Sequence, residues 1–192
     1  MKGHRKQYLL SVLLGMMVSG YLLAATSQKE EGTPERFKAV NVQAKTAKAN
    51  PATQLDILVE KYTTDNERQG YAKLLKEQGP DALRRTLEKV NVGQISVPGA
   101  VGVPIAVARI RETDGGRRIR LVTTRSMSFL QVRRGDSSDY PYTVMDLYLD
   151  ENAKGKGSVL TAVKIFFDDQ GQLQAQAVGG DPLELINVEK VD

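Results

Sequence analysis

Alternating apolar and polar residues occupy most of the chain after residue 90 and predict β-strands. With the strand period of two, every second side chain lies on the same face of a sheet. In segment 142–150, Met145, Leu147 and Leu149 fall on one face, and Asp146 and Tyr148 fall on the other. Similar runs separated by short turns occur at 103–112, 117–123, 126–134, 158–168, 172–178 and 183–191. Strands at this spacing are typical of an antiparallel meander.

Segment 103–134 holds the clearest hairpin. Asp114, Gly115 and Gly116 favour the positive φ angles of a tight turn between two strands. In the first strand, Arg109 interrupts the apolar alternation and moves it to the other face. We therefore expect a β-bulge near Ala108, which would bend the sheet.

Two short helices are predicted between residues 64 and 90, where the apolar period changes to 3.6. Thr64 and Glu67 have the spacing of a capping box. Gly79 suits the end of the first helix, and Pro80 suits the first turn of the second. Each helix has one narrow apolar face, so both must pack on a sheet. Upstream, segments 36–45 and 54–62 predict an opening strand hairpin.

These elements predict an α+β fold. The body is mainly an antiparallel β meander, either a sandwich or a partly closed barrel, with one pair of short helices packed on it. We expect residues 36–192 to form a single β-rich domain, because a chain of this length can bury one sizeable core. Residues 28–35 are polar and contain Gly32 and Pro34, so they predict a disordered spacer.

The first 27 residues have the pattern of a signal peptide helix. Lys2, Arg5 and Lys6 precede an uncharged, largely apolar run from residue 8 to residue 25, and small residues follow. We expect cleavage before Gln28, with cleavage after Ala25 as the second choice. The run also reaches the lower limit of a membrane span, so an uncleaved N-terminal anchor is the alternative. Cleavage and retention of the leader both predict an extracytoplasmic domain, periplasmic or secreted. The protein would contact a membrane only through an uncleaved leader.

Charge and composition exclude several function classes. The chain has 27 basic and 23 acidic residues; three basic residues and no acidic residue lie in the leader, so the remainder carries a net charge of about +1. That balance argues against nucleic-acid binding. The single histidine, His4, lies in the leader, and the chain has no cysteine. The domain therefore lacks Cys/His nucleophile pairs, Ser-His-Asp triads, disulfides and His or Cys zinc sites. We expect no cofactor.

Carboxylates are the remaining candidates for catalysis or metal binding. Two sets of residues could supply a general acid and a general base. One set is Asp146, Asp150 and Glu151, and the other is Asp168 and Asp169. The chain has no tryptophan to form a sugar-binding platform, and alternating acids are typical of an exposed strand face. Segments 150–152 and 168–170 lack the ligand spacing of a calcium loop. We therefore predict no catalytic residue and no metal ligand.

Arginines gather between residues 109 and 134, where eight of them accompany only two acids. Guanidinium groups suit carboxylate or phosphate ligands. The candidate ligand-binding residues are therefore Arg109, Arg111, Arg118, Arg120, Tyr140 and Tyr142. The simpler interpretation, which the sequence favours, is that basic strands lie beside acidic ones and form cross-strand pairs that each add little stability.

Several short motifs carry a resemblance to a known family. They are residues 64–68 (TDNER), 115–119 (GGRRI), 128–129 (SF), 139–141 (DYP), 147–150 (LYLD), 155–157 (GKG), 182–183 (PL) and 187–188 (NV). With these motifs, residues 54–190 resemble an uncharacterised family of exported bacterial proteins. Met127 and Leu130 depart from the family pattern, which has a proline and an aromatic residue there. The resemblance implies export and the domain limits, and it implies no activity or functional residue.

Two function classes remain. The first is a non-enzymatic binding module whose curved sheet encloses a small or lipidic ligand, because strand 158–168 is apolar on both faces. The alternative is an envelope or secreted domain for protein–protein interaction or structure. That domain would have no ligand cavity and would contact a partner protein through its arginine-rich face or through its N-terminal tail.

Overall fold

The computed structural model describes residues 34–42, 53–125, 127, 141–167, 173–177 and 182–191. Its strands are β1 (Glu35–Val42), β2 (Thr53–Val59), β3 (Gly93–Ser96), β4 (Val103–Pro104), β5 (Val107–Thr113), β6 (Gly116–Thr123), β7 (Tyr142–Asp150), β8 (Lys154–Phe167), β9 (Leu173–Ala177) and β10 (Leu183–Val191). The helices are α1 (Asp65–Gln78) and α2 (Pro80–Leu87). The predicted leader, Tyr140, Asp168, Asp169 and the predicted strand at 126–134 apart from Met127 lie outside the described residues.

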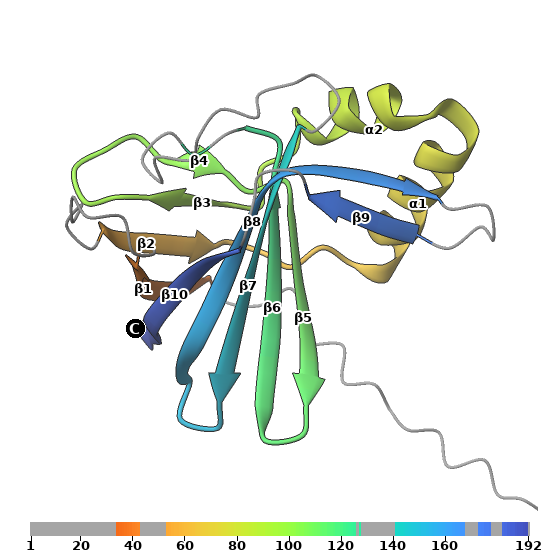
Figure 1. Ribbon diagram of the computed structural model, residues 1–192. Helices are drawn as coiled ribbons and strands as arrows, with labels where there is room; N and C mark the ends of the chain where they lie inside the picture. Colours follow the sequence, from red (N-terminus) through yellow and green to blue (C-terminus); the bar gives the residue numbers. More distant parts are fainter. Residues whose placement is uncertain are drawn as a thin grey trace, which may run out of the picture.

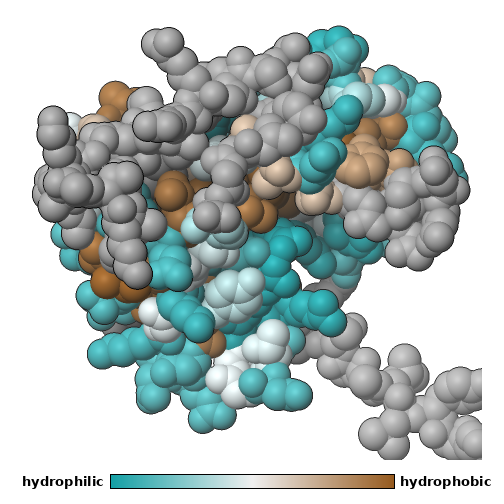
Figure 2. Space-filling model, in the orientation of Figure 1, coloured by the Kyte–Doolittle hydropathy of each residue, from teal (hydrophilic) through white to brown (hydrophobic). Residues whose placement is uncertain are grey.

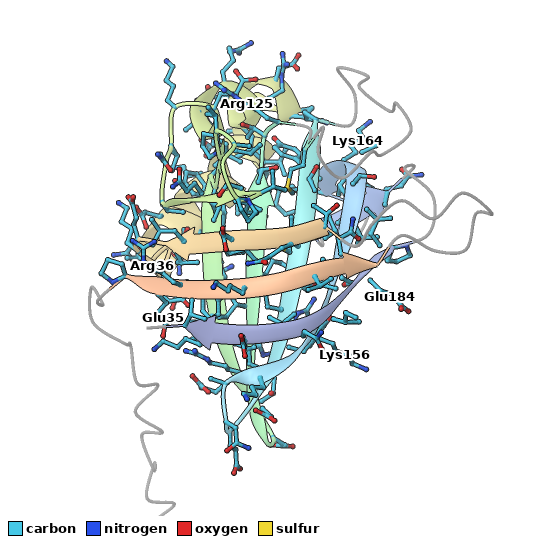
Figure 3. The ribbon with its side chains drawn as sticks, turned by 90° about the vertical axis from the view of Figure 1, so that its left-hand side faces the viewer. Glu35, Arg36, Arg125, Lys156, Lys164 and Glu184 are labelled. Atoms are coloured by element: carbon cyan, nitrogen blue, oxygen red, sulfur yellow. The ribbon has the colours of Figure 1, made fainter. Side chains whose placement is uncertain are left out.

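One curled antiparallel sheet forms the body and confirms the predicted α+β class. Its strand order is β4-β3-β2-β1-β10-β8-β7-β6-β5, and β9 pairs with β8 off this path. The first arm (β1–β4 and β10) crosses the second arm (β5–β8) at a steep angle (Figures 1 and 3). The result is a half-barrel, which matches the partly closed form of the prediction.

The first and last strands in this order, β4 and β5, meet at one corner of the half-barrel. Only Ile105 and Ala106 separate β4 from β5. The backbone N–H of Ile105 donates to the carbonyl of Gly93 in the first arm at 2.8 Å, and that of Ala106 donates to the carbonyl of Val122 in the second arm at 2.8 Å. Consecutive residues thus bond to opposite arms, which satisfies their buried backbone groups and joins the edges of the sheet.

This corner explains why the predicted bulge near Ala108 is wrong. The pairing of β5 with β6 runs without a shift from Val107 and Val122 to Thr113 and Gly116. The apolar alternation changes phase because the chain turns from one arm to the other at residues 105–106. A register shift occurs instead between β7 and β8, where Ala162 has a φ of 50°.

The concave side of the half-barrel is filled by side chains from both arms. The buried residues include Phe37, Leu55, Ile57, Val59 and Ile95 from the first arm, Ile119, Leu121, Met145, Leu147 and Val159 from the second, and Leu185 and Val188 from β10. Full burial of one large aliphatic side chain contributes about 1.5–3 kcal/mol. This inner core is therefore the main source of stability.

The helix pair covers the other face of the second arm. As predicted, Thr64 caps α1 in a capping box with Glu67, and Gly79 separates the two helices. The pKa of Glu67 is lowered because its carboxylate accepts a hydrogen bond from the backbone N–H of Thr64. Leu75, Leu83 and Leu87 pack against the outward side chains of β6–β8, including Val122, Val144 and Val163. No helix of the described residues is long and apolar enough to span a membrane.

Candidate binding face

The outward side of the second arm, below the helices, carries two rows of charged side chains. Directly opposite residues on paired strands share a face. One row runs through Arg109, Arg120, Asp146 and Ser158, and the next through Arg111, Arg118, Tyr148 and Lys156. We call these eight residues the arginine face. In Figure 2, the surface over the lower parts of β5–β8 is mostly hydrophilic. The structure thus brings together the four arginines that the sequence singled out.

Asp146 is the centre of this face and is only 5% exposed. Arg118 Nη2 donates to Asp146 Oδ2 at 2.6 Å, and Arg120 donates from Nε to Oδ1 at 2.8 Å and from Nη2 to Oδ2 at 2.9 Å. Burial raises the pKa of Asp146, whereas Arg118 opposes that rise. The predicted cross-strand pairing is confirmed, but its carboxylate is buried rather than solvated.

The guanidinium group of Arg118 also contacts the ring of Tyr148. Its guanidinium carbon lies 5.4 Å from the centre of the Tyr148 ring, a cation–π arrangement. Burial lowers the pKa of Arg118, but Asp146 and Tyr148 outweigh it and raise the pKa above its ordinary value. Tyr148 remains 41% exposed. Tyr148 is not among the binding residues that the sequence predicts, although its alternation with Leu147 and Leu149 places it on the outer face.

The remaining basic residues of the face have different environments. Arg109 is committed to the fold, because it donates from Nη1 to the carbonyl of Thr63 at 2.6 Å and from Nη2 to Asp65 Oδ1 at 2.8 Å. Arg111 and Lys156 are exposed at the two ends of their row, and neither has an ion-pair partner within the described part of the chain. They are the cations of this face that remain available to a ligand.

Tyr142, another candidate, does not belong to this face. It lies at the start of β7 in the apolar cluster beneath the helices and is 2% exposed. Burial raises the pKa of Tyr142 to about 12. Its separation from the arginines corrects the predicted grouping. The sequence could not show this, because whether outward positions of β7 are covered depends on where α2 packs.

A second charged cluster, which the sequence did not predict, closes the concave side near the start of β1. Glu35 is 3% exposed and accepts hydrogen bonds from Tyr62 Oη at 2.5 Å and from Arg117 Nη1 at 3.1 Å. Lys190 Nζ lies 3.2 Å from Glu35 Oε1. Burial, followed by the hydrogen bond to Glu35, raises the pKa of Tyr62. The predicted spacer ended at Glu35; the structure instead makes Glu35 the first residue of β1.

Of the other predicted acids, Asp150 has a structural role. Asp150 Oδ1 accepts hydrogen bonds from the backbone N–H groups of Asn152 and Lys154, and so orders the turn between β7 and β8. No group of three or more His, Cys, Asp or Glu residues that could hold a metal ion occurs among the described residues.

Comparison of the chain with protein-family models, with curated proteins and with solved structures returns no match in any of the three. The resemblance to an exported bacterial family therefore stays a prediction.

Proposed function

We propose that the protein is an exported, non-enzymatic binding domain that recognises an acidic partner protein through its arginine face. The observation that carries this proposal is the excess of positive charge on that face. Its two rows hold five basic side chains, and Asp146 and Asp65 are the two carboxylates that contact them in the described structure. The predicted leader supports export.

A binding site on the outside agrees with the packing of the inside. A small or lipidic ligand within the half-barrel would have to displace Leu121, Met145, Leu147 and their neighbours, which are fully buried. Exposing such side chains or forcing them aside costs several kcal/mol. The packed core therefore favours an interaction domain over a container for a ligand.

Preorganisation makes the arginine face suitable for binding. Asp146 fixes the guanidinium groups of Arg118 and Arg120, so a partner does not have to bear the full entropy cost of ordering two long side chains. Arginine and tyrosine are also the residue types enriched in the energetic centres of protein interfaces. Arg118 with Tyr148 supplies such a pair, and Arg111 and Lys156 extend it on either side.

An acidic protein suits this face better than a nucleic acid does. Proteins that bind single strands stack successive bases on several aromatic rings. The two rows contain one aromatic ring, that of Tyr148. The near-neutral charge of the chain after its leader also lacks the overall basic excess of nucleic-acid binders.

The test is binding of a labelled poly-glutamate peptide, followed by fluorescence anisotropy at low and physiological salt. The variant Arg111→Glu with Lys156→Glu should weaken binding roughly tenfold or more, because two attractive contacts become repulsive. The matched control, Lys76→Glu with Lys89→Glu, makes the same charge change at exposed positions in α1 and in the turn after α2, and should bind nearly as well as the parent protein. If both variants lost the same amount of affinity for the peptide, the net charge of the protein would explain the loss, and the assignment of binding to the arginine face would be refuted. Tighter binding of a single-stranded oligonucleotide than of the peptide would refute the choice of partner.

A further inference from the structure

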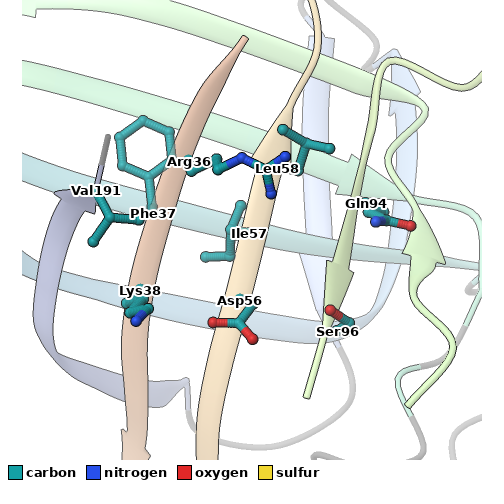
Figure 4. Close-up of a pocket in the computed structure, with 9 residues that line it drawn as sticks. All are labelled: Arg36, Phe37, Lys38, Asp56, Ile57, Leu58, Gln94, Ser96 and Val191. Carbon is teal, nitrogen blue, oxygen red and sulfur yellow. The ribbon is translucent and has the colours of Figure 1, made fainter. Parts of the chain in front are cut away.

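A pocket of about 340 Å³ lies on the first arm, away from the arginine face (Figure 4). Arg36 and Lys38 of β1, Asp56 and Leu58 of β2, Gln94 and Ser96 of β3, and Val191 of β10 line it. The side chains of Phe37 and Ile57 face the inner core, so these two residues contribute their backbone to the floor. The volume falls in the range of small-molecule sites.

Three charged side chains, those of Arg36, Lys38 and Asp56, line this pocket. Lys38 and Asp56 are directly opposite in the pairing of β1 with β2 and lie side by side in Figure 4. Neither they nor Arg36 has an ion-pair partner within the described residues. Two cations on β1 and a carboxylate on β2 thus face the same small space, within reach of the charged groups of a ligand.

The uncharged residues add hydrogen-bonding groups and an apolar surface. Ser96 is opposite Asp56, and Gln94 is opposite Leu58. Gly102 leaves room for the Gln94 side chain, because a Cβ at position 102 would lie 2.9 Å from Gln94 Oε1. Leu58 and Val191 supply partly buried apolar contacts, on either side of Arg36 in the same row.

We propose that this pocket binds a short peptide with free termini, about two residues long. The peptide's carboxylate lies between Arg36 and Lys38, and its ammonium group contacts Asp56 and Ser96. Neighbouring strands are about 4.8 Å apart, so the cations of β1 lie roughly 5–10 Å from the acceptors of β2 and β3. An extended dipeptide spans at most about 7 Å, which lies within that distance. Its apolar side chain contacts Leu58 or Val191.

This inference goes beyond the proposed function and does not depend on it, since the two sites lie on different arms. The test measures binding of the dipeptide Ala-Leu to the purified protein by isothermal titration calorimetry. Two further probes each remove one charge: N-acetyl-Ala-Leu lacks the ammonium group, and Ala-Leu amide lacks the carboxylate. Each modification should weaken binding roughly tenfold or more, because it leaves a charged group of the pocket without its partner.

Variants assign each terminus to its residue. Asp56→Asn should weaken the binding of Ala-Leu. This variant should bind Ala-Leu and N-acetyl-Ala-Leu equally well, but should still bind Ala-Leu more tightly than Ala-Leu amide. Arg36→Gln should bind Ala-Leu and Ala-Leu amide equally well, but should still bind Ala-Leu more tightly than N-acetyl-Ala-Leu. The control variant Arg111→Ala with Lys156→Ala should bind Ala-Leu unchanged, which separates this site from the arginine face. Absence of binding at millimolar peptide, equal affinity for all three probes, or the same selectivity in both variants would overturn the proposal.

Discussion

The two faces of the sheet each have a buried carboxylate held by two cations, yet the two clusters differ in how exposed their cations are. On the concave side, Glu35 contacts Arg117 and Lys190. On the outer side, Asp146 contacts Arg118 and Arg120. The side chain of Arg117 is 15% exposed, whereas that of Arg120 is 47% exposed. Similar ionic chemistry therefore closes the core on one face and presents positive charge to solvent on the other.

The sequence separation of the partners explains the difference. The inner cluster joins four segments of the chain. Glu35 on β1 contacts Tyr62 in the connector after β2, Arg117 on β6 and Lys190 on β10. The outer cluster joins only β6 to its neighbour β7. A cluster that joins distant segments stabilises the closure of the half-barrel, and loss of one member affects several elements together. The outer cluster orders a surface, and its loss should be felt locally.

The largest effect should come from a charge on the inner face of β7. Leu147→Asp places a carboxylate among fully buried apolar side chains and should unfold the domain, since burial of an unpaired charge costs at least several kcal/mol. The neighbouring change Tyr148→Asp, on the outer face, should preserve the fold. Circular dichroism and urea denaturation measure both. A Leu147→Asp protein that melts cooperatively at the parent temperature would contradict the assigned core.

Removal of the inner carboxylate should have the next largest effect. Glu35→Ala leaves Arg117 and Lys190 without their anion and Tyr62 without its acceptor, so unfolding free energy should fall by about 3 kcal/mol. Glu184→Ala is the matched control, because Glu184 is exposed on β10 and should change stability by less than about 0.5 kcal/mol. Equal losses in the two variants would show that the Glu35 cluster does not hold the arms together.

The outer cluster should show a smaller loss. From the sequence alone, Arg118→Ala with Arg120→Ala is expected to leave stability nearly unchanged. The structure predicts a loss of about 1–3 kcal/mol, because Asp146 is left buried without its cations while water gains partial access to it. Urea denaturation measures the loss. An unchanged unfolding free energy would support the original expectation and show that Asp146 is readily hydrated.

The pH dependence of that double variant sharpens the comparison. Burial raises the pKa of Asp146 and Arg118 opposes the rise, so removal of the arginines should raise the pKa further. A group with a raised pKa in the folded state binds its proton more tightly there than in the unfolded state. The deficit relative to the parent protein should therefore be largest at neutral pH and shrink as the pH falls and Asp146 takes up its proton. A deficit that grows on acidification would contradict this cause.

The smallest effect on stability should come from the ends of the arginine face. Arg111→Ala with Lys156→Ala removes no ion pair or side-chain hydrogen bond within the described structure and should change unfolding free energy by less than about 0.5 kcal/mol. Thermal melting checks this. A substantial loss would show that these side chains serve the fold and would weaken the proposal that they bind a partner.

Much of this architecture could be predicted from local patterns. The alternation in 142–150 identified Leu147 as inward and Asp146 as outward, and Thr64, Glu67 and Gly79 marked the helix ends. The alternation of β6 likewise placed Arg118 and Arg120 together on the outer face. These predictions succeeded because side-chain direction and capping depend on residues close in the chain.

Features that depend on distant pairing could not be predicted. Nothing in residues 35–42 indicates that β1 pairs with β10, so the sequence places Glu35 in a spacer rather than in a buried cluster. The phase change near Arg109 was interpreted as a bulge because the corner at residues 105–106 exists only when both arms are in place. Similarly, the burial of Tyr142 depends on where α2 packs.

The sequence by itself determined which residues alternate, where the helices begin and end, and which arginines share a face. Tertiary structure alone decided which carboxylates those arginines contact and how exposed they remain. The physical reason is that alternation follows from backbone geometry over a few residues, whereas burial and ion pairing depend on strand register and on segments that are distant in the chain.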